Sequence, residues 1–301
     1  MKIVWIVLAV AAGAGLLALG FGCLLAAFSM RIKRQTLDEA WAWQEDHYDL
    51  SWYGPLKKED YTVRCRDGYL LHVQHLYNPR PNARAVIISH GYTDNRYGSL
   101  KYAKNYLDLG FDVLIYDLRG HGENEKTYCT YSLRESRDLN MLIRDTRDRF
   151  PELKVLGLHG ESLGGATTVA VLKYAPKVDF AVSDCAFSEI KPILTAGLRS
   201  MHLPEGLIGL SGFCAKLLYH CSYDEMRPID SLARTTLPIL FIHGADDDFI
   251  PPSHASAMHA AAEDHSELHL AEGAGHAASV LTVPEEYRRW LRGFLRDCDL
   301  L

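Results

Sequence analysis

Hydrophobic and polar positions divide this chain of 301 residues into an uncharged N-terminal segment and a longer body. Residues 3–30 contain no charged side chain, and about 20 apolar residues are enough for a helix to cross a bilayer. The glycines of this segment would weaken a helix in water but are common in membrane helices. The segment also exceeds the apolar core of a cleaved signal peptide, which has about 7–15 residues. The pattern therefore predicts that residues 1–30 form an uncleaved transmembrane anchor.

Basic residues flank this anchor unevenly. Arg31, Lys33 and Arg34 follow it directly, whereas only Lys2 and the terminal amine precede it. Basic residues beside a membrane helix favour the cytoplasmic side. We therefore expect a single-pass protein of the cell membrane whose C-terminal body lies in the cytoplasm.

Residues 31–60 form a juxtamembrane segment. Thr36 and Glu39 have the spacing of a capping box, which predicts a short helix from Leu37 to about His47. The segment is rich in aromatic residues, namely Trp41, Trp43, Tyr48, Trp52 and Tyr53. Such rings either lie among lipid headgroups or pack on the body, and the sequence leaves both interpretations open.

From Tyr61 onward, short apolar runs alternate with helix-like patterns. The runs that predict buried strands are Ala85–Ser89, Val113–Asp117, Lys154–His159, Phe180–Asp184, Ile239–His243 and Glu267–Leu270. The helical patterns are Leu100–Leu109, Leu133–Phe150, Gly165–Tyr174 and Pro284–Arg296. A leading antiparallel hairpin is expected around Asp67-Gly68. This alternation predicts βαβ units and a mostly parallel sheet with helices on both faces.

The alternation breaks between about residues 187 and 228. Residues Ile193–Tyr219 are helical and rather apolar, with interruptions at Pro204 and at several glycines. Because this stretch lies between two predicted core strands, we expect an inserted cap over the carboxyl edge of the sheet; an ordinary pair of packing helices is the alternative. The expected organisation is an anchor, a juxtamembrane segment and one α/β domain over residues 61–301 that contains the cap.

Composition narrows the class of protein. With 48% hydrophobic residues, 23% charged residues and a formal net charge of -6, the chain is typical of a globular protein and not of a nucleic-acid binder. Its seven cysteines are scattered without a CxxC pair, which disfavours a metal knuckle. We expect free thiols in a reducing compartment, and we predict no cofactor and no metal.

The segment Gly160-Glu161-Ser162-Leu163-Gly164 matches Gly-x-Ser-x-Gly. A predicted strand precedes it and a helical pattern follows it, which is the context of a nucleophile elbow. In such an elbow the serine sits on a strained turn, the glycines keep bulk away from neighbouring backbone, and the helix directs its first N–H groups at the reacting centre. Ser162 is therefore the candidate nucleophile.

A serine hydroxyl needs a base within hydrogen-bond reach, and the base needs an orienting acid. His276 is the candidate base, because it comes last in the chain and lies on a glycine-rich loop after the last predicted strand. The candidate acids are Asp246, Asp247, Asp248 and, at the end of an earlier strand, Asp184. A calcium site at the three adjacent carboxylates has only weak support.

The developing oxyanion needs hydrogen-bond donors. One candidate is the backbone N–H of Leu163, the residue after the nucleophile, and the other is that of Tyr92, in the loop after strand Ala85–Ser89. The other histidines that adjoin a glycine are expected to be loop or supporting groups, namely His90, His121, His159 and His243.

Together these motifs resemble those of serine esterases of the α/β-hydrolase superfamily. The matching pieces are His90–Asn95, Asp117–Gly122, Gly160–Gly164, His243–Pro251 and Gly275-His276. Their residues are similar to those of membrane-anchored bacterial hydrolases related to the BEM46-like group. The resemblance implies the α/β-hydrolase fold, and it makes Asp247 the acid, the fourth residue of the family pattern Gly-x-x-Asp-x-x-Val-Pro. It also implies that the loop Arg119–His121 is a structural support.

These observations predict a serine hydrolase that cleaves carboxylic esters or thioesters through an acyl-enzyme on Ser162. A serine peptidase or an acyltransferase on the same fold is the alternative among enzymes, and a non-catalytic, membrane-anchored binding protein is the alternative of a different class. The apolar cap suggests a substrate with an apolar acyl or aromatic group, and the anchor suggests a membrane-derived one. Glu161, beside the nucleophile, either repels anionic substrates or points away from the site.

Overall fold

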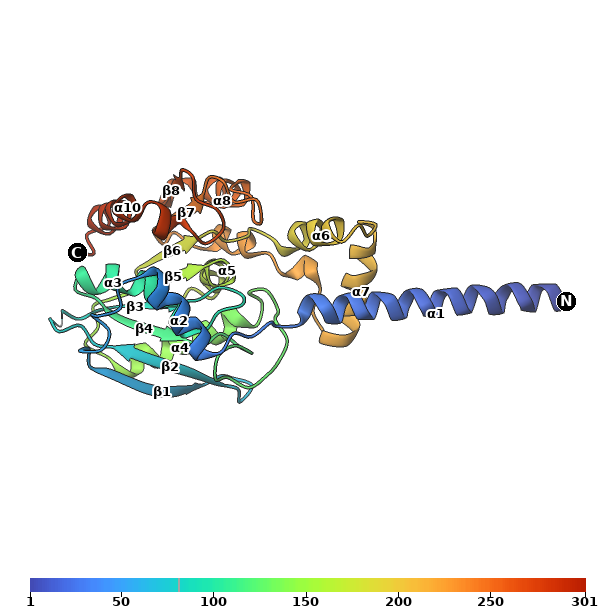
Figure 1. Cartoon of the computed structure of the whole chain (residues 1–301), viewed down its shortest axis with the longest axis horizontal. Coiled ribbons are helices and arrows are strands. Elements are labelled where there is room, and N and C mark those ends of the chain that lie inside the picture. The colour runs from blue at the N-terminus through green and yellow to red at the C-terminus, as the bar shows by residue number, and fades with distance from the viewer. Residues whose placement is uncertain (81) are drawn as a thin grey trace. The chain divides into compact units, whose positions relative to one another are not determined.

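A computed structural model describes residues 1–80 and 82–301, and Figure 1 shows the arrangement of its helices and strands. The chain forms two compact units. The first, here called the helical unit, comprises Met1–Arg31 together with Ile190–Met226. The second, here called the sheet unit, comprises Ile32–Glu189 together with Arg227–Leu301.

The sheet unit is built on an eight-stranded sheet with the order β1-β2-β4-β3-β5-β6-β7-β8. Its strands are β1 (Lys58–Arg64), β2 (Leu70–Leu76), β3 (Arg84–Ser89), β4 (Asp112–Tyr116), β5 (Val155–Glu161), β6 (Phe180–Asp184), β7 (Ile239–Gly244) and β8 (Ser266–Ala271). β2 pairs antiparallel with β1 and with β4, and the other pairs are parallel. The predicted strands, leading hairpin and mostly parallel sheet are thus confirmed. Because parallel strands end along one edge, the loops after β3, β4, β5, β7 and β8 meet there.

Helices cover both faces of this sheet. α3 (Leu100–Asp108) and α10 (Pro284–Asp297) share one core with residues such as Val86 and Ile88 of β3. The intervening Ile87 faces the other side, because successive side chains of a strand alternate. There α4 (Glu135–Arg149) and α5 (Leu163–Val171) pack against each other, and α5 packs on β5 and β6. The shorter helices of this unit are η1 (Arg96–Ser99), η2 (Leu172–Tyr174), η4 (Pro228–Arg234), α8 (Ser253–Ala260), η5 (Glu263–His265) and α9 (Ser279–Thr282).

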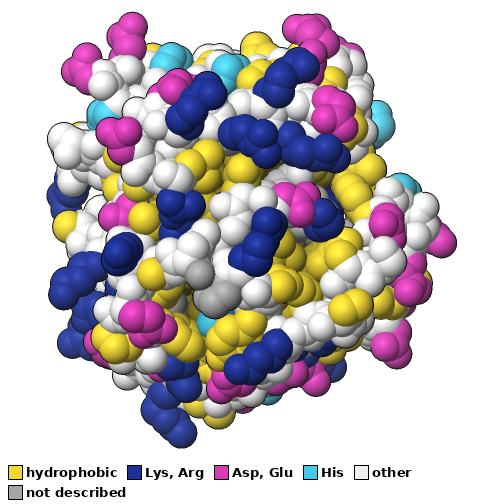
Figure 2. All heavy atoms as spheres, turned by 90° about the vertical axis from the view of Figure 1, so that its left-hand side faces the viewer, with side chains coloured by type: hydrophobic (Ala, Val, Ile, Leu, Met, Phe, Trp, Pro, Cys, Tyr) yellow, Lys and Arg dark blue, Asp and Glu magenta, His cyan; other side chains and the backbone are white. Residues whose placement is uncertain are grey.

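Burial follows the side-chain periodicity of each element. In α10, Tyr287, Leu291 and Phe294 recur at helical spacing and are buried, while the arginines between them are exposed. β7, by contrast, is buried at every position, as expected for a parallel strand covered on both faces. The surface carries charges of both signs: on the face drawn in Figure 2, Lys and Arg side chains are interspersed with Asp and Glu.

The juxtamembrane segment packs on the rest of the sheet unit. α2 (Leu37–His47) begins at the predicted capping box, in which the Thr36 side chain accepts the Glu39 N–H and the Glu39 carboxylate accepts the Thr36 N–H. Four of the five aromatic residues of the segment join or line the core, namely Trp41, Tyr48, Trp52 and Tyr53. Of the two interpretations left open, packing on the body is the one that the structure supports for these rings.

The helical unit consists of α1 (Lys2–Met30), α6 (Ile190–Ser200), α7 (Leu207–Tyr219) and the short η3 (Tyr223–Glu225). α1 is 29 residues long and apolar enough to cross a membrane. α6 and α7 belong to the insertion between β6 and β7, and the gap between the two helices contains Pro204. Figure 1 shows α7 alongside the C-terminal part of α1, while the N-terminal part of α1 extends beyond it.

Candidate active site

Ser162 lies in a sharp turn between β5 and α5. Its φ of 52° and ψ of -113° lie outside the regions that residues with a side chain usually occupy, as expected for a nucleophile elbow. Ser162 N donates to Asp184 O (2.8 Å), and Ala166 N donates to Ser162 O (2.9 Å). Since α5 begins at Leu163, its first N–H groups lie next to Ser162 and have no acceptor within the helix.

Two glycines make this turn possible. A Cβ atom on Gly160 would lie 2.1 Å from the carbonyl oxygen of Gly164, and one on Gly164 would lie 2.1 Å from that of Ser89. Neither clash could be relieved without displacing the elbow or the end of β3. The expectation that these glycines keep bulk away from neighbouring backbone is confirmed.

Ser162, His276 and Asp247 meet at the carboxyl edge of the sheet. His276 Nε2 lies 2.9 Å from Ser162 Oγ, and His276 Nδ1 lies 2.7 Å from Asp247 Oδ2. The three residues follow β5, β8 and β7 respectively, so three separate loops contribute. The side chain of His276 is 23% exposed, whereas that of Asp247 is fully buried. In this order, the imidazole can accept the hydroxyl proton while the carboxylate orients the ring.

Asp247 is the buried member of the three adjacent aspartates, and Asp246 and Asp248 are exposed. Its Oδ1 atom accepts the N–H groups of Phe249 (3.0 Å) and Ile250 (2.8 Å). These backbone donors hold the carboxylate in one orientation, with Oδ2 turned to His276. The structure therefore separates three aspartates that the residues themselves left equivalent.

A second histidine contacts the same carboxylate. His243 Nε2 lies 3.2 Å from Asp247 Oδ2 and 2.7 Å from Ile250 O. Burial alone would raise the pKa of Asp247, but hydrogen bonds from His243 and His276 hold that pKa well below its usual range. Asp247 is consequently ionised at neutral pH. The supporting role expected of His243 is thus a contact with the Asp247 carboxylate, which the sequence alone did not indicate.

Gly244 lets the loop that carries His276 approach β7. A Cβ atom on Gly244 would lie 2.3 Å from Ala274 O, and Asp246 N donates to the same oxygen at 3.0 Å. This contact brings His276 within reach of Asp247. The only signal in the sequence is that a glycine lies two positions before the acidic run Asp246–Asp248.

Asp184 occupies a different site. Its carboxylate is fully buried and accepts hydrogen bonds from Tyr102 Oη (3.3 Å) and Ser279 Oγ (3.4 Å). The structure therefore places Asp247, and not Asp184, against His276. Burial, together with the nearby charge of Glu161, raises the pKa of Asp184 to about 6.

Replacing Asp184 with asparagine is expected to remove one contribution to the free energy of unfolding, which changes between about pH 4 and pH 6. A carboxyl whose pKa is raised on folding stabilises the protein fully below its unfolded pKa, about 4, and this contribution is lost as the pH rises through about 6. Denaturant unfolding of the wild type and of Asp184→Asn across this range should show the variant gaining relative stability toward neutral pH. A constant difference would contradict the assigned pKa shift.

Glu161, directly before Ser162, is turned into the protein and neutralised. Its carboxylate forms a buried ion pair with Lys101 of α3 and accepts a hydrogen bond from Tyr102 Oη (2.5 Å). Lys101 Nζ also donates to Ala277 O (3.5 Å), next to His276. Lys101 thus joins the elbow to the His276 loop. Of the two alternatives for Glu161, the structure supports the side chain that points away.

Replacing Lys101 with methionine is expected to destabilise the protein by about 3–5 kcal/mol, because the Glu161 carboxylate would remain buried without its cationic partner. Lys104→Met is the matched control on the same helix: its ion pair with Asp108 is exposed and is expected to contribute at most about 0.5 kcal/mol. Denaturant unfolding measures both. Combining Lys101→Met with Glu161→Gln should recover part of the loss, and a loss that the second change leaves unaltered would contradict the ion-pair explanation.

The loop that contains Tyr92 lies against the elbow. A Cβ atom on Gly91 would lie 3.9 Å from Ser162 Cβ. His121, in the loop after β4, forms a short hydrogen bond through Nε2 with Tyr92 O. Arg119 of the same loop forms a buried ion pair with α4. Within the loop Arg119–His121, His121 thus contacts the Tyr92 backbone, and Arg119 ties the loop to α4.

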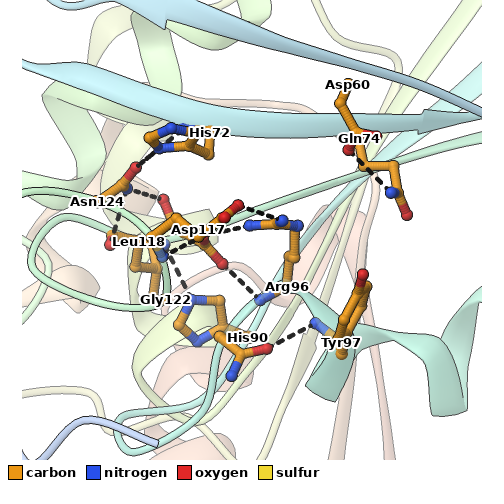
Figure 3. Close-up of polar contacts among 12 residues, drawn as sticks. Asp60, His72, Gln74, His90, Arg96, Tyr97, Asp117, Leu118, Gly122 and Asn124 are labelled. Carbon is orange, nitrogen blue, oxygen red and sulfur yellow. Dashed lines mark hydrogen bonds and ion pairs between the residues drawn. The ribbon is translucent and has the colours of Figure 1, made fainter. Parts of the chain in front are cut away.

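Figure 3 shows the polar contacts that join the loops after β3 and β4 to η1. The Asp117 carboxylate accepts the backbone N–H of Arg96 (2.8 Å) and pairs with its guanidinium group (2.6 Å). The carbonyl oxygen of Asp117 accepts Asn124 Nδ2 (2.7 Å). His90 Nε2 accepts the Leu118 N–H (2.9 Å), which ties the loop after β3 to the loop after β4. His90 is thereby a supporting group within the described fold.

A polar pocket of about 410 Å³ lies beside this network. It is lined by residues of β1, β2 and η1 and by Glu123, and it includes none of Ser162, Asp247 and His276. Its one buried cation, Arg96, is already paired with Asp117 and Glu123. Within residues 1–80 and 82–301, no group of three or more His, Cys, Asp or Glu side chains is arranged to hold a metal ion.

The amino-acid sequence is similar to one family model and to several known proteins. The model of a family described as serine aminopeptidase, S33, matches residues 80–204. The uncharacterized protein YqkD of Bacillus subtilis is 30% identical over 287 residues, which cover 93% of this chain and 94% of YqkD. The uncharacterized membrane protein YNL320W of Saccharomyces cerevisiae is 24% identical over 215 residues, which cover 71% of this chain and 71% of YNL320W.

Solved structures show the same fold. The esterase Pf2001 of Pyrococcus furiosus superposes with a TM-score of 0.71 at 20% sequence identity, over 89% of this chain and 98% of the esterase. At this level of identity the likeness concerns the fold alone. It confirms the fold that the motifs predicted.

Proposed function

Because this chain belongs to the α/β-hydrolase superfamily, we propose that it is a serine hydrolase that cleaves carboxylic esters or thioesters. The observation that carries the proposal is the position of His276 between the Ser162 hydroxyl and the ionised Asp247 carboxylate. A hydroxyl, an imidazole and a carboxylate in hydrogen-bond contact make a neutral serine nucleophilic.

In the proposed reaction, Ser162 Oγ attacks the acyl carbonyl carbon while His276 Nε2 takes its proton. Asp247 Oδ2 accepts the His276 Nδ1–H and stabilises the imidazolium. His276 then protonates the leaving alcohol or thiol, which leaves the acyl group on Ser162. A water molecule, deprotonated by His276, releases the acid and restores the serine.

The oxyanion of this reaction is proposed to bind the backbone N–H groups of Leu163 and Tyr92. Leu163 is the first residue of α5, and the Tyr92 loop lies against the elbow. One such donor typically lowers the barrier by about 3 kcal/mol. The contact of His121 with Tyr92 O would keep this second donor in place.

The substrate is proposed to carry an apolar acyl or aromatic group. Phe249 is 60% exposed and lies edge-on to the His276 ring, with 5.0 Å between centroids. Tyr92, which is half-buried, stacks on the buried Tyr131. Phe249 therefore offers apolar surface beside His276, and Tyr92 offers a smaller part. The neutralised Glu161 adds no repulsion against an anionic substrate.

A serine peptidase is the second candidate, because the matching family is described as serine aminopeptidase. Acyl transfer would use the same acyl-enzyme with an alcohol or amine in place of water. A non-catalytic binding protein is disfavoured, because His276 contacts both the Ser162 hydroxyl and the Asp247 carboxylate, which binding alone would not require.

The protein is proposed to be anchored in the cell membrane through α1, with the sheet unit in the cytoplasm. α1 is long and apolar enough to span a bilayer, and the related yeast protein is named a membrane protein. The basic residues directly after α1 favour the cytoplasmic side for the body.

The test is hydrolysis of p-nitrophenyl esters of increasing acyl length by the full chain in detergent, with a fluorophosphonate probe run in parallel. We expect turnover with an optimum at an intermediate or long acyl chain, and covalent labelling of Ser162. Faster cleavage of aminoacyl anilides than of esters would favour the peptidase, and faster p-nitrophenol release with added alcohol would favour acyl transfer. A folded protein with neither turnover nor labelling would overturn the enzymatic proposal.

A further inference from the structure

The C-terminal part of α1 packs closely on α7. A Cβ atom on Gly22 would lie 2.6 Å from Leu210 Cγ, so the glycine lets the two helices approach each other. Ala26 and Met30, one and two turns further along α1, are buried. Small residues one turn apart are typical of helix contacts within membranes.

Polar contacts accompany this packing. Cys214 Sγ on α7 donates to Leu19 O at 3.6 Å. Nearer the end of α1, Ser29 Oγ and Tyr223 Oη form a hydrogen bond of 2.6 Å, and Tyr223 Oη also bonds to Ser211 Oγ (2.9 Å). The contacts between α1 and the insertion therefore extend from Leu19 to Ser29.

This range fixes the depth of α7 if α1 spans a bilayer. A helix of 29 residues is about 43 Å long, whereas the hydrocarbon core measures about 30 Å and takes up about 20 residues. A span that begins near Lys2 leaves the core close to Phe21, within the part of α1 that contacts α7. The basic residues Arg31 and Lys33 follow on the headgroup side. α7 would thus lie at the boundary between acyl chains and headgroups.

The side of α7 opposite its buried residues is apolar and exposed. Ser211, Cys214 and Ala215 are buried on one side of the helix. Phe213 and Leu217 lie one turn apart on the other side and are 61% and 57% exposed. The exposed Lys216 adjoins them. An outward face of aromatic, aliphatic and basic residues is typical of helices that lie in a membrane interface.

We infer that α7 docks on the lipid bilayer beside α1, with Phe213 and Leu217 immersed and Lys216 near the headgroups. The lipid surface is the occupant because the helix on which α7 packs enters that surface at the same depth. The inference rests on the proposed anchoring through α1. It adds that the insertion, and not α1 alone, contacts lipid.

The test uses the full chain in vesicles of phosphatidylcholine and phosphatidylglycerol. Spin labels are attached to cysteines introduced by Leu217→Cys or Phe213→Cys, in a background that carries Cys23→Ser and Cys298→Ser. Leu8→Cys in α1 controls for the anchor, and Glu152→Cys, an exposed position of the sheet unit, controls for water. Each label is measured for collision with oxygen, which concentrates in lipid, and with a nickel complex, which stays in water.

We expect labels at 217 and 213 to favour oxygen over nickel, at a depth of about 5–10 Å, with the label at 8 deeper and that at 152 in water. If the label at 8 favours oxygen but those at 217 and 213 favour nickel, anchoring stands and docking is wrong. Labels at 217 and 213 that are shielded from both reagents would mean that protein covers this face, which also overturns docking. A label at 8 in water would refute the anchor and, with it, the docking.

Discussion

Replacing Ser162 with alanine is expected to lower kcat for ester hydrolysis by about 10⁴- to 10⁶-fold and to abolish phosphonate labelling. Alanine removes the Oγ atom that lies 2.9 Å from His276 Nε2, so no acyl-enzyme can form. The backbone of the elbow should persist, because its hydrogen bonds and glycines do not involve the hydroxyl. Steady-state kinetics on the preferred p-nitrophenyl ester measures the effect.

Ser183→Ala is the matched control for this change. Ser183 is buried in the neighbouring strand β6, and its hydroxyl has no hydrogen-bond partner among the described residues. We expect its kcat and its labelling to stay near those of the wild type. A Ser162→Ala variant that folds and retains most of its activity would rule out Ser162 as the nucleophile.

Replacing Asp247 with asparagine is expected to lower kcat by about 10⁴-fold, with a much smaller change in the free energy of unfolding. The amide keeps the shape of the side chain but has no negative charge to stabilise the imidazolium of His276. It can also present an N–H group to His276 Nδ1, which favours the wrong tautomer. The measurement is kcat at neutral pH, together with a check of the unfolding midpoint.

The chain supplies its own controls for Asp247. Asp246→Asn and Asp248→Asn remove one charge each from exposed neighbours of the same loop. Both should retain kcat within a few-fold, because neither carboxylate contacts His276 among the described contacts. Equal losses in all three variants would indicate an effect of loop charge instead of a specific role for Asp247.

The local sequence was sufficient to predict those elements whose structure depends on interactions between residues close together in the chain. The capping box at Thr36 predicted the start of α2 because its two hydrogen bonds join residues three apart. The elbow at Gly160–Gly164 was predictable because a strand, a glycine-flanked serine and a helix are consecutive in the chain. Uniform burial of the central strands follows from their apolar runs, since a parallel sheet is covered on both faces.

Long-range contacts decided what the pattern left open. Asp246, Asp247 and Asp248 are alike as residues, and the family pattern of the resemblance singled out Asp247. The structure adds the contact of its carboxylate with His276, which lies 29 positions later in the chain. The partner of Glu161 could not be predicted. Lys101 lies 60 positions earlier on another helix, and only the packing of α3 on the sheet brings the two charges together.

The sequence by itself determined the apolar N-terminal helix, the order of strands and helices, and the residue types of the candidate site. Each of these depends on periodicity or on neighbours within a few positions. The tertiary structure alone decided where the juxtamembrane aromatic rings pack, that Lys101 pairs with Glu161, and that α1 packs with α7 of the insertion. The physical reason is that these contacts join segments far apart in the chain, whose approach depends on the packing of the whole fold and not on any local pattern.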